Sequence, residues 1–214
     1  MRLGPVIGKV LGAVAFCLAE SALAAGPPGD ARLGRELAVS ERCVECHVAG
    51  GPGIVPSGRH AKLAGQSAAY LAKQLRDYRG GQRRHEVMSV LARDLDDTDI
   101  AHLAAYFAGE PAMRGEGMAA DAVAAAKSLY LQGDAARGIA ACAACHGERG
   151  EGLALGGNVV APVIKGQERL YLEKQLHDWR TGERNNAADG AMGQAVQALT
   201  DRDIEALAAY LSGL

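Results

Sequence analysis

The chain has 214 residues and a formal net charge of -2, with 49% hydrophobic residues and a pI near 6.3. This length is enough for two small domains, each with its own core. The near-neutral charge argues against a surface that follows nucleic-acid phosphates, so no nucleic-acid partner is expected. One Trp, six Tyr and two Phe supply little aromatic volume, which leaves room in each core for a large, flat, apolar cofactor.

The N-terminal end has the pattern of an export signal. Two basic residues, Arg2 and Lys9, precede an apolar run at 10–18, and small residues close the segment. We therefore expect a signal peptide at 1–24, cleaved after Ala24, and a periplasmic protein. A retained membrane anchor is the alternative, although the apolar run is shorter than the roughly 20 residues that a spanning helix needs.

A repeated motif carries all the cysteines that follow this segment. CVECH lies at 43–47 and CAACH at 142–146. In an oxidising compartment a bare Cys-x-x-Cys pair tends to form a disulfide unless another group consumes the thiols. The same spacing also suits a metal clip or a covalently attached cofactor, so the neighbouring residues have to decide among the three.

The histidine that closes each motif favours the attached cofactor. In one helical turn positions i, i+3 and i+4 lie on one face, so Cys43, Cys46 and His47 can meet a single planar group. Cys-x-x-Cys-His is the attachment signature of c-type haem. A zinc site would need four ligands close together, whereas each motif repeats as a self-contained unit, which disfavours zinc and a thioredoxin-like redox pair.

The chain contains one unit twice. Residues 62–83 match 163–184 and residues 88–109 match 192–213 when the two cysteine motifs are aligned. The offset between the copies grows along the chain, which predicts small loop insertions in the second copy. Between the copies lies a small, polar, proline-containing linker. We expect a first domain at 25–110, the linker at 111–119 and a second domain at 120–214.

Both copies predict helices in the same order. An amphipathic stretch precedes the cysteine motif, a glycine-rich loop follows it, and a middle helix holds the shared YLxKQL segment. The last helix has an apolar face and begins at a side chain that can cap its free N–H groups, with an aspartate three positions on, namely Asp96 with Asp99 and Thr200 with Asp203. No alternating strand pattern is found, so the sequence predicts an all-α fold.

The sixth ligand of a haem iron should recur at equivalent places in both copies. Among the methionines after residue 24, only Met88 and Met192 align, whereas Met113 and Met118 lie in the linker. His85 is a rival ligand for the first site, but no histidine occupies its place in the second copy. A purely core-filling role for the aligned methionines is the other alternative.

These features together resemble the dihaem cytochrome c4 family, which has two class I cytochrome c domains in tandem. The shared pattern is Cys-x-x-Cys-His, a G-Q-x-x-x-Y-L-x-K-Q-L segment and a late Met before D-I-x-x-L-A-x-Y, and it covers nearly the whole chain after the leader. The resemblance implies that each domain wraps around one covalently attached haem c. It also implies two thioether bonds and one His and one Met axial ligand for each haem: Cys43, Cys46, His47 and Met88 for the first, and Cys142, Cys145, His146 and Met192 for the second.

The resemblance further implies that a backbone carbonyl after each motif accepts a hydrogen bond from the ligand histidine and fixes its orientation. Pro162 fits this role in the second copy, while Ala61 stands at the matching place in the first. The residue after the motif differs as well, since Gly147 matches Val48. We therefore predict two haems of unequal reduction potential, with any specialisation at the first.

Further polar residues recur in both copies. We expect them to bind haem propionates, to lie in the domain interface or to stand on solvated helix faces, the last being preferred for the lysines. They are Tyr70, Lys73, Gln74 and Arg79 with their counterparts Tyr171, Lys174, Gln175 and Arg180.

The predicted function is electron transfer rather than catalysis, because a histidine and a methionine fill both axial positions and leave no open site for oxygen or peroxide. We expect a periplasmic carrier of single electrons without a small-molecule substrate. Its partners are redox proteins: a quinol-oxidising complex or a dehydrogenase as donor, and a terminal oxidase or reductase as acceptor. Two alternatives stay open, namely the electron-accepting subunit of a dehydrogenase complex and a dihaem peroxidase with a labile sixth ligand.

Overall fold

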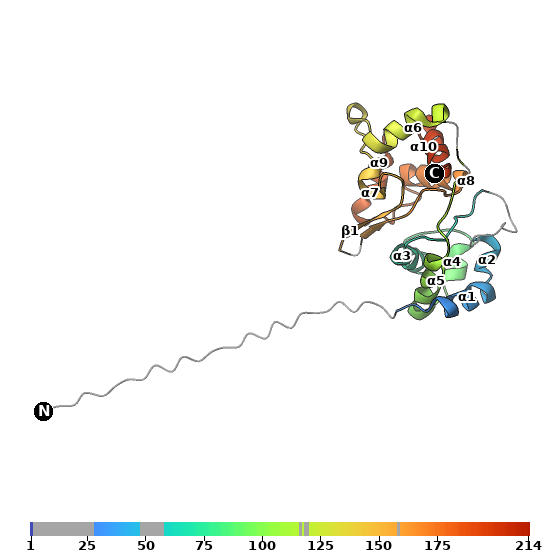
Figure 1. Cartoon of the computed structure of the whole chain (residues 1–214). Helices are drawn as coiled ribbons and strands as arrows, with labels where there is room; N and C mark the ends of the chain where they lie inside the picture. Colours follow the sequence, from blue (N-terminus) through green and yellow to red (C-terminus); the bar gives the residue numbers. More distant parts are fainter. Residues whose placement is uncertain (2–27, 48–57, 116, 118–119, 158) are drawn as a thin grey trace.

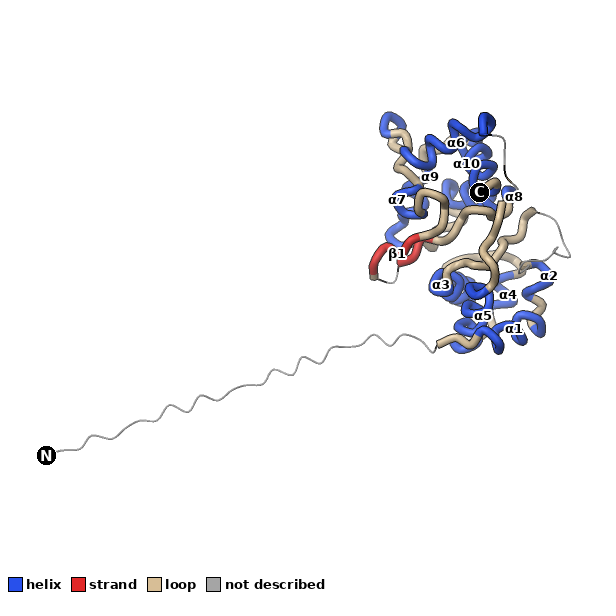
Figure 2. Tube along the Cα trace, in the orientation of Figure 1, coloured by secondary structure: helices blue, strands red, loops and turns tan. Residues whose placement is uncertain are grey.

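The computed structural model describes residues 1, 28–47, 58–115, 117, 120–157 and 159–214. These residues form two domains that follow one another along the chain, blue to green and then yellow to red in Figure 1. Helices make up most of both domains, as predicted (Figure 2). The predicted signal peptide beyond its first residue, Val48 and Met118 lie outside the described residues. Within those residues no helix is long and apolar enough to cross a membrane.

The first domain is organised around a close crossing of its first and last helices. Its elements are α1 (Ala31–Ser40), α2 (Cys43–Cys46), α3 (Ala68–Arg79), α4 (Met88–Ala92) and α5 (Asp97–Gly109). A Cβ on Gly34 of α1 would lie 2.0 Å from the carbonyl oxygen of His102 in α5. Ala38, Leu103 and Phe107 belong to the buried core of this domain. The missing side chain of Gly34 therefore sets how closely α1 and α5 approach.

The second domain repeats this plan with extra connections. Its elements are α6 (Ala120–Gln132), η1 (Ala135–Arg137), α7 (Ala143–His146), β1 (Leu153–Gly156), β2 (Val159–Ala161), α8 (Arg169–Thr181), η2 (Ala188–Gly190), α9 (Ala191–Val196) and α10 (Asp201–Ser212). Tyr130 of α6 is fully buried and packs its ring against Tyr210 of α10, with 5.7 Å between centroids. Its hydroxyl donates to the carbonyl of Gly147 at 2.6 Å. Tyr130 thus ties the terminal helices to the end of the cysteine motif.

The prediction of no strands was wrong at one place. β1 and β2 pair in an antiparallel hairpin, drawn in red in Figure 2, within the loop that is longer in the second copy. Strands of four and three residues are too short to show an alternating pattern. Glycines at positive φ, including Gly152 at 78° and Gly156 at 95°, supply the bends that a short hairpin needs.

The last helix of each domain begins as the sequence predicts. Asp96 accepts hydrogen bonds from the N–H groups of Thr98 and Asp99, and the Asp99 carboxylate accepts from the N–H of Asp96. Thr200 and Asp203 form the same reciprocal capping box at α10. These caps satisfy N–H groups that have no partner inside the helix.

The recurrent arginines act next to these caps, within their own domains. Arg79 donates to the carbonyl of Leu95 at 2.8 Å, and Arg180 donates to that of Leu199 at 2.7 Å. Arg79 also pairs with Asp97 at 2.7 Å, as Arg180 does with Asp201. The arginines therefore hold the middle helix of each domain against the start of the last one. The recurrent lysines pair one helical turn on, Lys73 with Asp77 and Lys174 with Asp178.

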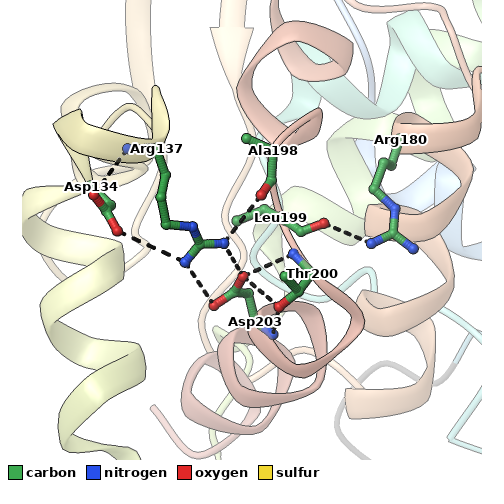
Figure 3. Close-up of polar contacts among 7 residues, drawn as sticks. All are labelled: Asp134, Arg137, Arg180, Ala198, Leu199, Thr200 and Asp203. Carbon is green, nitrogen blue, oxygen red and sulfur yellow. Dashed lines mark hydrogen bonds and ion pairs between the residues drawn. The ribbon is translucent and has the colours of Figure 1, made fainter.

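In the second domain one side chain, the Arg137 staple, links two segments that are distant in the sequence. The described residues of the first domain contain no counterpart. Figure 3 shows Arg137, on η1, reaching the start of α10. Its guanidinium donates to the carbonyl of Ala198 at 3.1 Å and pairs with the carboxylate of Asp203. The added chain between α6 and α7 is thereby fastened to the capping box of the last helix.

The linker passes over two equivalent glycine turns, one from each domain. Gly65 and Gly166 have φ angles of 68° and 65°, a region that favours glycine. A Cβ on Gly65 would lie 2.5 Å from the Cα of Ala112, and one on Gly166 would lie 2.8 Å from the carbonyl carbon of Arg114. Met113 between them is buried. The linker is therefore packed against both domains.

A pseudo-symmetric polar cluster joins the two middle helices. Arg83 donates to Gln74 of its own domain at 2.8 Å and to Gln175 and Tyr171 of the other domain at 2.7 and 3.1 Å. Arg184 makes the reciprocal set, with Gln175 at 2.6 Å and with Gln74 and Tyr70 at 3.0 Å each. The recurrent tyrosines and glutamines thus lie in the domain interface.

Candidate functional site

The first cysteine motif forms the single turn of α2 and leads directly to His47. The N–H of His47 donates to the carbonyl of Cys43 at 2.9 Å, which places the histidine one turn after the first cysteine. Nδ1 of His47 lies 2.8 Å from the carbonyl oxygen of Ala61. Because a carbonyl only accepts, Nδ1 carries the hydrogen and the lone pair of Nε2 is left for a metal. Burial lowers the pKa of His47, which keeps the ring neutral as a ligand must be.

The second motif builds the same arrangement on α7. The N–H of His146 donates to the carbonyl of Cys142 at 2.9 Å, and Nδ1 of His146 lies 3.0 Å from the carbonyl oxygen of Pro162. His146 is buried, and this burial lowers its pKa. In both domains a carbonyl from the loop before the middle helix therefore holds the histidine ring at Nδ1. The lone pair of Nε2 is left to bind a metal.

The surroundings of the first thiol in each motif differ from those of a thioredoxin-like redox pair. Cys43, Cys46, Cys142 and Cys145 are all free. Burial raises the pKa of Cys43 to about 11 and also raises that of Cys142, whereas a thioredoxin-like pair needs a lowered thiol pKa. In the described part of the chain, no three His, Cys, Asp or Glu side chains gather closely enough to hold a metal ion. The geometry gives no support to the zinc alternative.

The aligned methionines occupy equivalent places in the two domains. Met88 begins α4, which packs on α3, and Met192 lies in α9, which packs on α8. Both side chains are half-buried. The rival ligand His85 accepts hydrogen bonds at Nδ1 from the N–H groups of Val87 and Met88, each at 3.3 Å. His85 thus caps the turn that leads to Met88.

Met113 is buried in the interface, with its sulfur 3.3 Å from Nε2 of Gln167.

The chemistry of this donor set fits a c-type haem in each domain. Each site offers two thiols for thioether bonds, one neutral imidazole and one thioether sulfur. Two buried cations, Arg83 and Arg184, have neutral polar partners and no carboxylate among the described residues. A cofactor that brings its own carboxylates, as haem does with its propionates, matches such an environment.

Sequence reasoning missed four interface residues: Gln66, Gln167, Arg83 and Arg184. A signal was present, because each of them recurs at the matching place in both copies. Their recurrence alone does not separate a role inside one domain from a role between domains.

Comparison with known proteins places the chain in a family. The Cytochrome c family model matches residues 31–109 and 123–214. Cytochrome c4 of Pseudomonas aeruginosa is 39% identical over 188 residues, which cover 87% of this chain and 89% of the relative. The thiosulfate dehydrogenase electron acceptor of Thiomonas intermedia is 36% identical over 207 residues, covering 94% and 87% of the two chains.

Solved structures agree with these sequence relatives. Reduced recombinant cytochrome c4 from Pseudomonas stutzeri matches with a TM-score of 0.77 and 33% identity, over 87% of this chain and 99% of that one. Thiosulfate dehydrogenase from Marichromatium purpuratum matches with a TM-score of 0.72 and 37% identity, over 86% of this chain and 40% of that one. The chain therefore belongs to the cytochrome c4 family, as an electron-transfer protein with two tandem cytochrome c domains that carry covalently attached haem c.

Proposed function

We propose that each domain holds its haem through the residues of its own motif and its aligned methionine. Cys43 and Cys46 in the first domain, and Cys142 and Cys145 in the second, supply the thioether bonds. The axial ligands are His47 with Met88 and His146 with Met192. The observation that carries the proposal is the hydrogen bond from each Nδ1 to a backbone carbonyl, at 2.8 and 3.0 Å, because it puts the ring hydrogen on Nδ1 and leaves the lone pair of Nε2 for the iron.

The ligand set suits electron transfer. The attached haem supplies one-electron chemistry. The histidine contributes a neutral donor, and the soft methionine sulfur favours ferrous over ferric iron. Since neither side chain has to leave, oxidation and reduction need little rearrangement of the protein.

The ligand proposal is tested by spectroscopy of the purified holoprotein. We expect the ferric form to show the red absorption band of a Met-iron bond at both sites, and the ferrous form to bind carbon monoxide poorly. A site that binds carbon monoxide readily, together with peroxide turnover, would support the peroxidase alternative instead. Replacing Met88 or Met192 by Leu should remove the band from one site at a time.

We further propose that the protein works in the periplasm and accepts electrons from a periplasmic dehydrogenase. The export-type N-terminus supports this location. Two relatives are named as thiosulfate dehydrogenase electron acceptors, from Thiomonas intermedia and, at 35% identity over 176 residues, from Stutzerimonas stutzeri. These names favour thiosulfate dehydrogenase as the first donor to test, ahead of a quinol-oxidising complex. A terminal oxidase or reductase is the proposed acceptor.

The donor is identified by reduction kinetics. The oxidised holoprotein is mixed with a purified thiosulfate dehydrogenase and thiosulfate, and separately with a quinol-oxidising complex and its quinol. Faster haem reduction in the first mixture is expected. Faster reduction in the second mixture would make the protein a carrier for the quinol-oxidising complex, and co-purification of the dehydrogenase would identify it as a bound subunit.

A further inference from the structure

One peptide unit connects the ligand histidine of the first domain to the second domain. The carbonyl of Ala61 accepts from Nδ1 of His47 at 2.8 Å. The N–H of the same peptide unit belongs to Lys62, and it donates to Oε1 of Gln167, in the second domain, at 2.7 Å. A continuous hydrogen-bonded path therefore runs from the His47 ring, through one peptide, to a side chain of the other domain.

The histidine of the second motif is connected to the first domain in the same way. The carbonyl of Pro162 accepts from Nδ1 of His146 at 3.0 Å. The N–H of the same peptide unit belongs to Val163, and it donates to Oε1 of Gln66, in the first domain, at 2.9 Å. Each ligand histidine is thus linked to a glutamine of the opposite domain.

Both glutamines are fixed in this orientation. Nε2 of Gln167 donates to the carbonyl of Lys62 at 2.9 Å, and Nε2 of Gln66 donates to that of Val163 at 2.8 Å. Each amide therefore meets one residue of the other domain with both its oxygen and its nitrogen, which leaves one consistent assignment of the two atoms. The exposed fractions are 5% for Gln66 and 4% for Gln167, so water does not compete for these bonds.

Hydrogen bonds in such a chain strengthen one another. When a peptide N–H donates to an acceptor, its carbonyl gains negative charge and becomes a better acceptor, by roughly 10–30% per bond in condensed phases. A stronger acceptor draws the Nδ1 hydrogen of the histidine and raises the basicity of Nε2. A more basic ligand stabilises ferric iron, so the bond from the glutamine lowers the reduction potential of the haem on that histidine.

We propose that Gln167 and Gln66 are positioning residues that tune the haem of the opposite domain: Gln167 acts on the first haem through His47, and Gln66 acts on the second through His146. The docking of the two domains is then part of each redox site. The inference rests on the proposed ligand roles of the two histidines.

The two connections are not equally braced. The side chain of Lys62 adds a bond from Nζ to the carbonyl of Gly166 at 2.9 Å and an ion pair with Glu168 at 3.3 Å. Val163, at the matching place in the second copy, has no polar side chain to do the same. The path from His47 to Gln167 is therefore held more firmly than its counterpart, and we expect the larger tuning effect at the first haem.

The test is a redox titration of the full-length holoprotein carrying Gln167→Leu or Gln66→Leu. The NMR signals of ¹³C-methyl-labelled Met88 and Met192 report the two haems separately. Gln167→Leu should raise the potential of the first haem so that its reduced-to-oxidised ratio at a fixed ambient potential rises at least threefold, about 28 mV at 59 mV per tenfold for a one-electron couple. Gln66→Leu should act in the same direction on the second haem.

Two further variants separate tuning from loosened docking. Gln167→Glu keeps an oxygen that accepts from the N–H of Lys62 and adds negative charge, so it should lower the potential of the first haem. Gln74→Leu is the matched control, because Gln74 is buried in the same interface and bonds neither peptide. It should shift neither haem selectively. Equal shifts in Gln74→Leu and Gln167→Leu would assign the effect to docking alone and overturn the tuning role.

Different results would contradict the ligand assignment and the tuning role of the glutamines. If the unmodified protein lacks the Met-iron band, the ligand assignment is wrong. If the band is present in all variants but Gln167→Leu leaves the first haem unshifted, or shifts mainly the second, the tuning role is wrong while the ligands stand. If Gln167→Leu shifts the potential of the first haem, Gln66→Leu shifts that of the second, and both variants keep the Met-iron band, the ligand assignment and the tuning role are both supported.

Discussion

The two domains reach the same site geometry along different peripheral routes. In the first, α1 leads into the cysteine motif almost directly, and Gly34 allows a close crossing with α5. In the second, η1 lies between α6 and α7, a hairpin follows the motif, and Arg137 fastens η1 to α10. Yet the histidine of each motif meets a carbonyl at nearly the same distance, 2.8 Å at Ala61 and 3.0 Å at Pro162. The site depends on the backbone path and tolerates different side chains around it.

This comparison changes where a difference between the haems should be sought. Ala61 stands in the first copy where the second has Pro162, and its carbonyl also accepts a hydrogen bond from the motif histidine. The absence of a proline therefore removes no hydrogen bond from the first site. Lys62 matches Val163 in the repeat. Its side chain bonds the carbonyl of Gly166 and pairs with Glu168, contacts that the apolar side chain of Val163 does not make. The predicted inequality of the two potentials stays a prediction, and its physical basis moves to the domain interface.

The largest expected effect is the loss of one redox site. His47→Ala removes the proposed proximal ligand of the first haem, so the low-spin spectrum of that haem should disappear while the second keeps its Met-iron band. His146→Ala should do the converse. Absorption and NMR spectra of the ferric proteins measure both. Loss of both sites from either variant would show that the two domains do not form their sites independently.

A second substitution breaks the helix crossing that only the first domain makes through a glycine. Gly34→Ala places a methyl group against the carbonyl of His102, and we expect it to destabilise the first domain by about 1–3 kcal/mol. Urea unfolding followed separately in each domain measures this. Gly109→Ala is the matched control, because a Cβ there meets nothing within 4 Å. Equal stability of the two variants would contradict the close approach.

The Arg137 staple predicts an acid sensitivity of the second domain. The hydrogen bond from Arg137 is the largest cause that lowers the pKa of Asp203, to about 2. The folded state therefore favours the ionised carboxylate, and this stabilisation is present above the ordinary pKa of an aspartate and is lost as the pH falls to about 2. Arg137→Ala should move the acid-unfolding midpoint of the second domain to higher pH, as measured by circular dichroism.

The control for that experiment lies in the first domain. Arg93 pairs with Asp94 at 3.2 Å, but their side chains are 67% and 80% exposed, and such a surface pair contributes little. Arg93→Ala should leave acid unfolding unchanged. A shift as large as that of Arg137→Ala would show that net charge, and not the staple, governs the transition.

The smallest expected effect is that of Pro162→Ala. It makes the second site resemble the first, where the carbonyl of Ala61 already accepts from the histidine. The bond from His146 should persist, and the reduced-to-oxidised ratio of the second haem should change less than twofold in a redox titration. A change as large as that of Gln66→Leu would mean that the proline ring, rather than its carbonyl, tunes the haem.

Much of the fold follows from local patterns. The cysteine motifs and the capping boxes at Asp96 and Thr200 each involve residues within a few positions of each other, and helix formation obeys such short-range rules. The repeat needs no spatial information either, because it is read by aligning the two halves of the sequence. The hairpin of β1 and β2 was missed because its strands are too short to carry a period. The sequence sets Met113 apart from the aligned methionines, but it does not predict that Met113 is buried in the interface.

By itself the sequence determined the chemistry of this protein: two motifs that attach haem c, two aligned methionines, and a duplicated helical unit around them. The tertiary structure alone decided that Gln66 and Gln167 cross to the opposite domain, over separations of 97 and 105 residues, and that Arg83 and Arg184 share one buried cluster. The reason is physical. A side chain that recurs in both copies has the same local pattern whether it bonds within its domain or across the interface, and only the packing of the domains selects between them.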